Sequence, residues 1–262
     1  MRALAIAVLV LAASPAFADP MTPDAFMALS SADQTAAYSK LSHDEQAALL
    51  AALTPMQLVT LAKASLKAMG PYQGEMVKQE RVDGKMLPQQ TMRVGVREAP
   101  FAVRLEVLAG PSKGRKVLYN SQLRAKELRA KESGFLGIAG GVWVDINGSL
   151  AKGDTNHVIT DTCFGSAIRL IEGDIKASES LGGLQRKDDG FNANGLYCMH
   201  VTAPKGAKTY ATKSKLCFDP VLRLPVAMEI EDAKGPLESF HWKNVKPHAW
   251  TDADFTPDAL GI

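Results

Sequence analysis

Few residues in this chain could perform chemistry, and they are scattered. Three cysteines and five histidines occur in 262 residues. A nucleophilic cysteine needs a lowered pKa and a neighbouring base, and His157 and Asp161 lie close to Cys163 in the sequence. The stretch "TDTCFGSAIRLI" around Cys163 matches no catalytic-cysteine signature. We therefore interpret Cys163 as a buried structural thiol and expect no enzyme, the alternative being an activity that depends on Cys163 and His157.

His157 and Asp161 are also the nearest approach to a metal site. Residues four apart share one face of a helix, but two ligands do not complete a zinc site. The sequence has no G-x-S-x-G or H-E-x-x-H pattern. We expect no metal, no cofactor and no catalytic residue. We interpret Glu80 and Glu98 as ion-pair partners of Arg81 or Arg97 across a sheet instead of general acid–base groups.

The first 18 residues have the features of a secretory signal peptide. Arg2 precedes the apolar run "ALAIAVLVLAA", and Ala16 and Ala18 form an A-x-A cleavage site. The run is shorter than the roughly 20 residues of a transmembrane helix. The sequence therefore predicts cleavage after Ala18 and a periplasmic protein without an integral membrane anchor. A formal net charge of +2 gives no sign of a nucleic-acid partner.

An oxidising compartment would allow one disulfide among the three cysteines. The segments "GLYCMHVTAP" and "KSKLCFDPVLRL" read as neighbouring strands, and the stretch between them contains the Pro and Gly that a loop needs. Cysteines that lie opposite each other on paired strands are close enough to bond. We predict a Cys198–Cys217 disulfide, with Cys163 unpaired.

Residues 19–70 are helical in character. Capping signals occur at Ser31 or Asp33, at Ser42 and at Thr54, and each precedes apolar residues at helical spacing. Gly70 and Pro71 would end the last helix. We expect a helical layer packed on the domain that follows, the alternative being a separate helical hairpin that binds a partner.

After Pro71 the pattern changes to strands. The stretch "TMRVGVREAPFAVRLEVL" alternates apolar and charged residues on both sides of a turn, as in a hairpin with one apolar face. More strands follow, interrupted by a helical pattern over residues 154–181 and by a glycine-rich apolar loop over residues 134–142. This order predicts an α+β fold whose mostly antiparallel sheet curves around a few helices.

The segments "MVKQERVDGKM", "VREAPFAVRLEVL" and "KGRKVLYN" resemble an uncharacterised family of exported bacterial proteins. More distantly, the chain is similar to the LolA and LolB lipoprotein carriers and the RseB sensor. The resemblance covers residues 71–262 and implies an unclosed antiparallel half-barrel with helices on its open side. The family-motif residues that carry it have no assigned role: Glu80, Arg81, Arg97, Pro100, Gly114, Arg115 and Tyr119.

In such carriers the concave face of the half-barrel holds acyl chains. The resemblance therefore implies that the apolar residues of the hairpin line a ligand site. These residues are Met92, Val94, Val96, Phe101, Val103 and Leu105. The hypothesis is a non-enzymatic periplasmic carrier or sensor that binds an acyl chain, a lipid or a lipoprotein. The alternative is a protein-interaction module of the cell envelope, whose filled core leaves no pocket.

Overall fold

The computed structural model describes residues 21–134 and 140–262. The expected signal peptide lies outside the described residues, as do residues 135–139 of the expected glycine-rich loop. The described strands are β1 (Tyr72–Val82), β2 (Lys85–Met86), β3 (Gln90–Glu98), β4 (Phe101–Ala109), β5 (Lys116–Asn120), β6 (Glu127–Lys131), β7 (Val142–Asp145), β8 (Gln185–Phe191), β9 (Tyr197–Thr202), β10 (Lys213–Asp219), β11 (Leu224–Asp232) and β12 (Gly235–Pro247).

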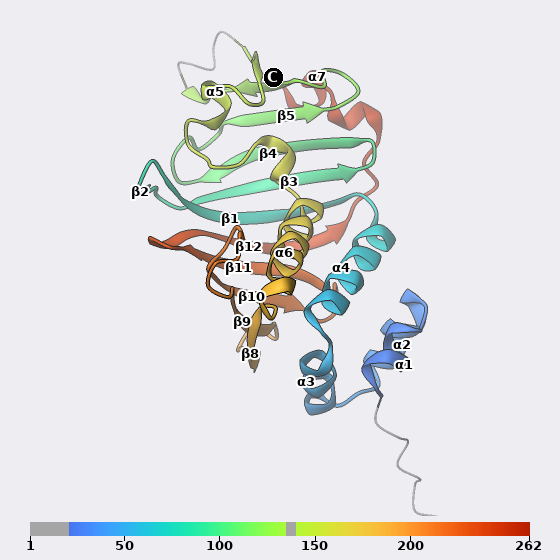
Figure 1. Ribbon diagram of the computed structural model, residues 1–262. Coiled ribbons are helices and arrows are strands. Elements are labelled where there is room, and N and C mark those ends of the chain that lie inside the picture. Colours follow the sequence, from blue (N-terminus) through green and yellow to red (C-terminus); the bar gives the residue numbers. More distant parts are fainter. Residues whose placement is uncertain (1–20, 135–139) are drawn as a thin grey trace, which may run out of the picture.

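These strands form one antiparallel sheet in the order β7-β6-β5-β4-β3-β1-β12-β11-β10-β9-β8, with β2 paired to β1 alone (Figure 1). The predicted hairpin is β3 and β4, joined at Ala99-Pro100. Val96 lies opposite Val103, and Val94 lies opposite Leu105. Since side chains alternate along a strand, these pairs share one face, and the charged residues between them point the other way. The α+β class and the unclosed half-barrel are confirmed.

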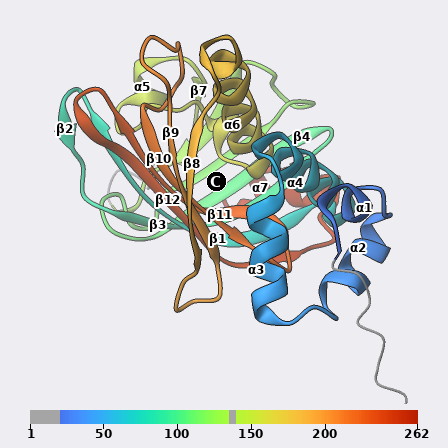
Figure 2. The same cartoon turned by 60° about the horizontal axis from the view of Figure 1, so that its bottom comes forward.

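From residue 21 onward, four helices precede the sheet: α1 (Pro23–Met27), α2 (Ser31–Tyr38), α3 (His43–Ala52) and α4 (Pro55–Met69). Ser42 and Thr54 cap α3 and α4 as predicted, each in a reciprocal capping box. The cap of α2 is Ser30 and not Ser31 or Asp33, the two positions expected from the sequence. The Ser30 hydroxyl accepts the Asp33 N–H. Figure 2 shows α1 and α2 beside α4.

The later helices are α5 (Ser149–Lys152), α6 (Phe164–Ser178) and α7 (Pro257–Leu260), with 3-10 turns η2 (Ile159–Asp161), η3 (Glu179–Leu181) and η4 (Asp252–Phe255). The helical pattern expected over residues 154–181 therefore holds only from Phe164 onward. Residues 154–163 form turns and the short η2 instead, and the side chains of residues 154–157 contact the sheet and the loop before β5. Among the residues described, no single helix has the length and hydropathy of a membrane span. Helices α3 and α4 together have the length and composition of one, but the pair is bent by 112°.

The hydrophobic core lies between the concave face of the sheet and helices α4 and α6, which lie in front of the strands in Figure 1. The first helices belong to the same core. Phe26, Leu49 and Leu53 are buried in the cluster that also contains Val96 and Ile168. The N-terminal helices thus pack on the sheet as a layer.

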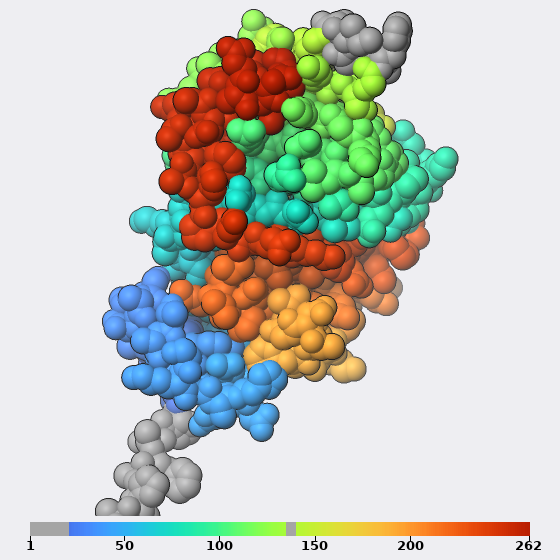
Figure 3. All heavy atoms as spheres, turned by 180° about the vertical axis from the view of Figure 1, so that it is seen from behind, coloured from blue at the N-terminus to red at the C-terminus, as the bar shows by residue number. Residues whose placement is uncertain are grey.

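The C-terminal segment covers the outer face of β3–β5, where it is the dark red band in Figure 3. Phe255 is fully buried there. Arg97 forms an ion pair with Asp252, and Arg104 donates to the Asp254 carbonyl at 2.9 Å. Asn120 donates to the Phe255 carbonyl at 3.2 Å. The expected pairing of Arg97 with a glutamate was therefore wrong, because Arg97 points to the outer face.

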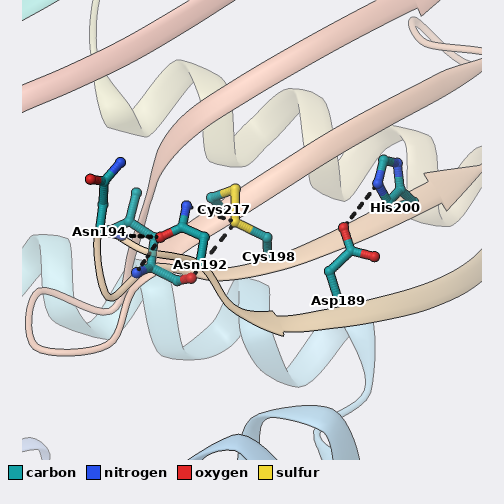
Figure 4. The surroundings of a disulfide bond; sticks show 7 residues. Asp189, Asn192, Asn194, Cys198, His200 and Cys217 are labelled. Carbon is teal, nitrogen blue, oxygen red and sulfur yellow. Dashed lines mark hydrogen bonds and ion pairs between the residues drawn. A yellow bond between two sulfur atoms is a disulfide. The ribbon is translucent and has the colours of Figure 1, made fainter.

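The predicted disulfide is confirmed. Cys198 and Cys217 lie directly opposite each other on β9 and β10, with Cα atoms 4.1 Å apart and a bond between their sulfurs (Figure 4). Cys163 is a buried free thiol. Because the bond joins adjacent strands near the β8 edge, it constrains the register of β9 against β10.

Candidate ligand cavity

A cavity of about 350 Å³ lies between the concave face of the sheet and α6. This volume is at the lower end of the range of small-molecule sites. Strands β1, β3 to β7 and β10 to β12 contribute one wall, and α6 with the turns before it forms the other. The apolar part of the wall includes Met76, Met92, Leu105, Val107, Val117, Leu128, Ala130, Val144, Ala167, Leu170 and Ile171.

The six residues expected to line a ligand fall into separate groups. Met92 and Leu105 line the cavity. Val94, Val96 and Val103 are fully buried on the same face but are not among its lining residues. Phe101 is partly buried and packs on Tyr119, with ring centroids 5.9 Å apart.

The first turn of α6 accounts for this division. The Tyr72 hydroxyl accepts the Phe164 N–H at 2.9 Å, and the ring of Phe164 packs on Tyr72 and Trp242 at centroid distances of 5.3 and 4.7 Å. Gly165 donates its N–H to Glu98, and a Cβ at Gly165 would lie 2.6 Å from the Glu98 carboxylate. The helix end thus seats tightly on the sheet. The concavity is filled at this end and hollow at the other.

The edge of the cavity near β7 and α5 is apolar and exposed. Leu150 on α5 is 86% exposed and Val142 on β7 is 57% exposed, and both line the cavity. Single exposed apolar side chains are common on protein surfaces. Several of them beside an apolar cavity indicate a binding site. This edge is therefore the candidate entrance.

A buried polar cluster crosses the cavity wall at β1 and β12. Glu80 and Glu238 lie opposite each other in register, and both are buried. Lys78 approaches Glu80 at 3.3 Å, while His157 and the Tyr210 hydroxyl contact Glu238 at 2.8 and 2.9 Å. Two adjacent buried carboxylates are tolerable only with such partners.

His157 is the protonated histidine of this cluster. Burial by itself would lower the pKa of His157, but Asp161, Glu238 and Glu80 outweigh it and raise the pKa to about 10. His157 is therefore an imidazolium at neutral pH, and together with Lys78 it places two cations beside Glu80 and Glu238. Sequence inspection missed Glu238 and Tyr210. One signal was present, because Glu238 shares the alternation of Phe240 and Trp242 and so had to point inward.

Three of the family-motif residues bind one turn, residues 154–156. Arg115 contacts the Asp154 carboxylate at 2.7 Å. Glu80 accepts from the Thr155 hydroxyl at 3.1 Å and from the Asn156 N–H at 2.9 Å, and the carbonyl of Arg81 accepts from the Asn156 amide. These residues hold the turn that closes the cavity. The expected pairing of Glu80 with an arginine was wrong, because the turn occupies its carboxylate.

The other motif residues lie elsewhere. Arg97 donates to the Pro100 carbonyl at 3.0 Å, and the Tyr119 hydroxyl donates to the Ala125 carbonyl at 3.0 Å. Gly114 has a φ of +87°, and a Cβ there would meet Ser133 at 2.9 Å. All of them fix local structure around β4 and β5, away from the polar cluster.

Cys163 lines the cavity, and its environment opposes nucleophilic chemistry. Burial raises the pKa of the thiol to about 12, with the charge of Glu98 adding to the effect. A thiol with this pKa stays protonated at neutral pH. Within residues 21–134 and 140–262, no group of three or more His, Cys, Asp or Glu side chains is arranged to hold a metal ion.

Several solved structures are similar to this chain over most of its length. A putative outer membrane lipoprotein-sorting protein domain from Vibrio parahaemolyticus shares 13% identity, with a TM-score of 0.40, over 79% of this chain and 98% of its own. The lipoprotein LppX from Mycobacterium tuberculosis shares 13% identity, with a TM-score of 0.44, over 76% and 98%. A LolA superfamily protein from Nitrosomonas europaea shares 13%, with a TM-score of 0.34, over 80% and 100%.

No significant match to a curated protein is found. A family model does match, and it spans residues 69–259, from the end of α4 through the sheet to the C-terminal segment. This span contains the cavity, the polar cluster and all of the motif residues discussed above. The chain therefore belongs to DUF1571, a protein family of unknown function.

Proposed function

We propose that the protein is an exported, non-enzymatic carrier or sensor that holds one acyl chain, from a lipid or a lipoprotein, between α6 and the concave face of the sheet. The observation that carries this proposal is the hollow end of the half-barrel, with its apolar wall and exposed apolar entrance. The Cys198–Cys217 bond supports an oxidising compartment such as the periplasm. Lipid or lipoprotein would be the cargo, and an envelope protein could exchange it.

The expected affinity follows from the burial of methylenes. Each buried CH₂ contributes about 0.8 kcal/mol, so a chain of about ten methylenes gains on the order of 8 kcal/mol. Ordering the chain and restricting its motion cost part of that gain. Because 8 kcal/mol corresponds to a Kd of about 1 μM before these costs, the expected Kd of a twelve-carbon chain is weaker than that, on the order of 10–100 μM.

Displacement of a neutral apolar dye tests the proposal. N-phenyl-1-naphthylamine should gain fluorescence with the wild-type protein and be displaced by dodecanol. Ala130→Phe places a ring in the cavity from β6 and should abolish dye binding while the protein stays folded. Val103→Ala, at the filled end, is the matched control. It should cost about 2–3 kcal/mol of stability but leave the dye affinity unchanged.

Three results would contradict the proposal. They are a wild-type protein that binds neither dye nor dodecanol, an Ala130→Phe variant that binds both normally, and a Val103→Ala variant that is stable but loses the dye. Circular dichroism and urea unfolding of each variant separate loss of binding from loss of fold.

A further inference from the structure

The charged side chains on the cavity wall do not balance. Among residues 21–134 and 140–262, six carboxylates line the cavity against three basic side chains, which gives a formal charge of −3 when His157 is counted as protonated. The whole chain carries a formal charge of +2. The carboxylates are Glu80, Glu132, Asp154, Asp161, Asp174 and Glu238, and the basic residues are Lys78, Arg115 and His157.

Every basic side chain that the structure places on this wall is already held by carboxylates. Arg115 lies between Glu132 and Asp154, at 2.7 Å from each. Lys78 binds Glu80, and His157 binds Glu238 and Asp161 in the same way. An anionic ligand head would therefore have to break one of these pairs before it gained a cationic partner.

The carboxylates nearest to solvent remain accessible. Glu132 and Asp154 have side chains that are 38% and 37% exposed. An ionised carboxylate has about four acceptor positions, so each keeps capacity after binding Arg115. They lie where the apolar wall meets solvent, on the turn after β6 and the turn after α5. A ligand with its chain inside the cavity would present its head to them.

We propose that the cavity selects amphiphiles with a cationic, ammonium-type head and rejects those with an anionic head. This inference rests on the proposed function, because it concerns the head of a ligand whose chain occupies the cavity. Attraction to the two rim carboxylates favours the ammonium, and the net negative wall repels a sulfate, phosphate or carboxylate. The apolar chain supplies the affinity, and the rim supplies the choice of head.

Calorimetric titration of the full mature chain with three twelve-carbon ligands tests the selection. Dodecyltrimethylammonium, dodecanol and dodecyl sulfate are compared at pH 7, each below the concentration at which it aggregates. The ammonium should bind at least about tenfold more tightly than the alcohol, and the sulfate at least about tenfold more weakly. Both differences should shrink in high salt, because the rim carboxylates are partly exposed.

Variants locate the effect. Glu132→Gln and Asp154→Asn, singly and together, should reduce the preference for the ammonium by about tenfold in the double variant, with dodecanol affinity unchanged. Glu106→Gln removes a carboxylate from the outer face of β4, where Glu106 pairs with Arg93, and should change nothing. Asp154→Asn could also loosen the turn at residues 154–156. Glu132 does not contact that turn, so Glu132→Gln alone tests the rim charge without this effect.

The outcomes separate the two proposals. Dodecanol binding without a preference for the ammonium, or with the sulfate bound as tightly as the alcohol, overturns the selection and leaves the carrier function standing. Selection that persists in Glu132→Gln with Asp154→Asn also overturns it, because another group would then be responsible. If dodecanol itself does not bind, both proposals fail.

Discussion

Replacement of His157 by glutamine should destabilise the protein strongly at pH 6 and hardly at all near pH 10. Burial opposes the imidazolium, but hydrogen bonds to Asp161 and Glu238 and the charge of Glu80 outweigh burial and raise the pKa from 6.5 to about 10. A pKa that is raised by folding adds stability that is fully present below the unfolded value. That stability is lost as the pH rises through the folded value.

The size of the effect follows from the pKa shift. One pKa unit corresponds to about 1.4 kcal/mol, so the full shift corresponds to roughly 5 kcal/mol at most. Solvent screens part of the interaction, because the Asp161 side chain is 32% exposed. We therefore expect His157→Gln to lose about 2–3 kcal/mol at pH 6, about half of that at pH 8, and almost nothing at pH 10.

Urea unfolding at pH 6, 8 and 10 measures this loss. His200→Gln is the matched control, because His200 pairs with Asp189 at the surface and its side chain is half exposed. The control should differ from wild type by less than about 1 kcal/mol at any of the three pH values. A His157→Gln variant as stable as wild type at pH 6, or one with a pH-independent loss, would refute the role given to the imidazolium.

Three further predictions concern other parts of the fold. Cys198→Ser with Cys217→Ser should lose about 3 kcal/mol in urea unfolding, since the bond closes a loop with a sequence separation of 19; an unchanged midpoint would contradict this. Phe255→Ala should cost about 3–5 kcal/mol because the ring is fully buried on the outer face, and a change in dodecanol affinity would show that the two faces are coupled. Cys163 should resist iodoacetamide in the folded protein, since its thiol pKa is raised to about 12; rapid alkylation would disprove the protonated state.

The sheet was predictable where its pattern is local. The alternation from Met92 to Leu105 predicts both the hairpin and its inward face, because a strand has a two-residue period. The pairing of Cys198 with Cys217 was predictable for the same reason, since both strands and their loop are contiguous. Helix caps such as Ser42 are short-range signals as well.

The site was predictable only in part, because it depends on contacts between distant segments. Whether a buried valine faces a ligand or a helix is decided by where α6 sits, and Phe164 is far from Val96 and Val103 in the sequence. The polar cluster likewise depends on residues from two loops, since Asn156 and His157 in one loop and Tyr210 in another contact Glu80 or Glu238. No periodicity reports such contacts.

The C-terminal segment was unpredictable for a different reason. It has only short helical turns, η4 and α7, and its contacts with the sheet use Arg97, Arg104 and Asn120, which look like ordinary solvent-facing residues in the sequence. A charged residue on the outer phase of a strand normally faces water. In this protein such residues bind a distant segment instead. Arg104 and Asp254, for example, are 150 residues apart in the sequence.

The position of a bound chain in a crystal tests whether the hollow end of the half-barrel holds an apolar chain. Crystals of the protein grown with 12-bromododecanol would report the bromine by its anomalous scattering. We expect a bromine peak inside the cavity, between Leu105 or Val107 on the sheet and Ile171 on α6. Two results would contradict a ligand-holding cavity. One is a bromine peak on the outer face of the sheet with none in the cavity, and the other is a cavity that its own side chains close.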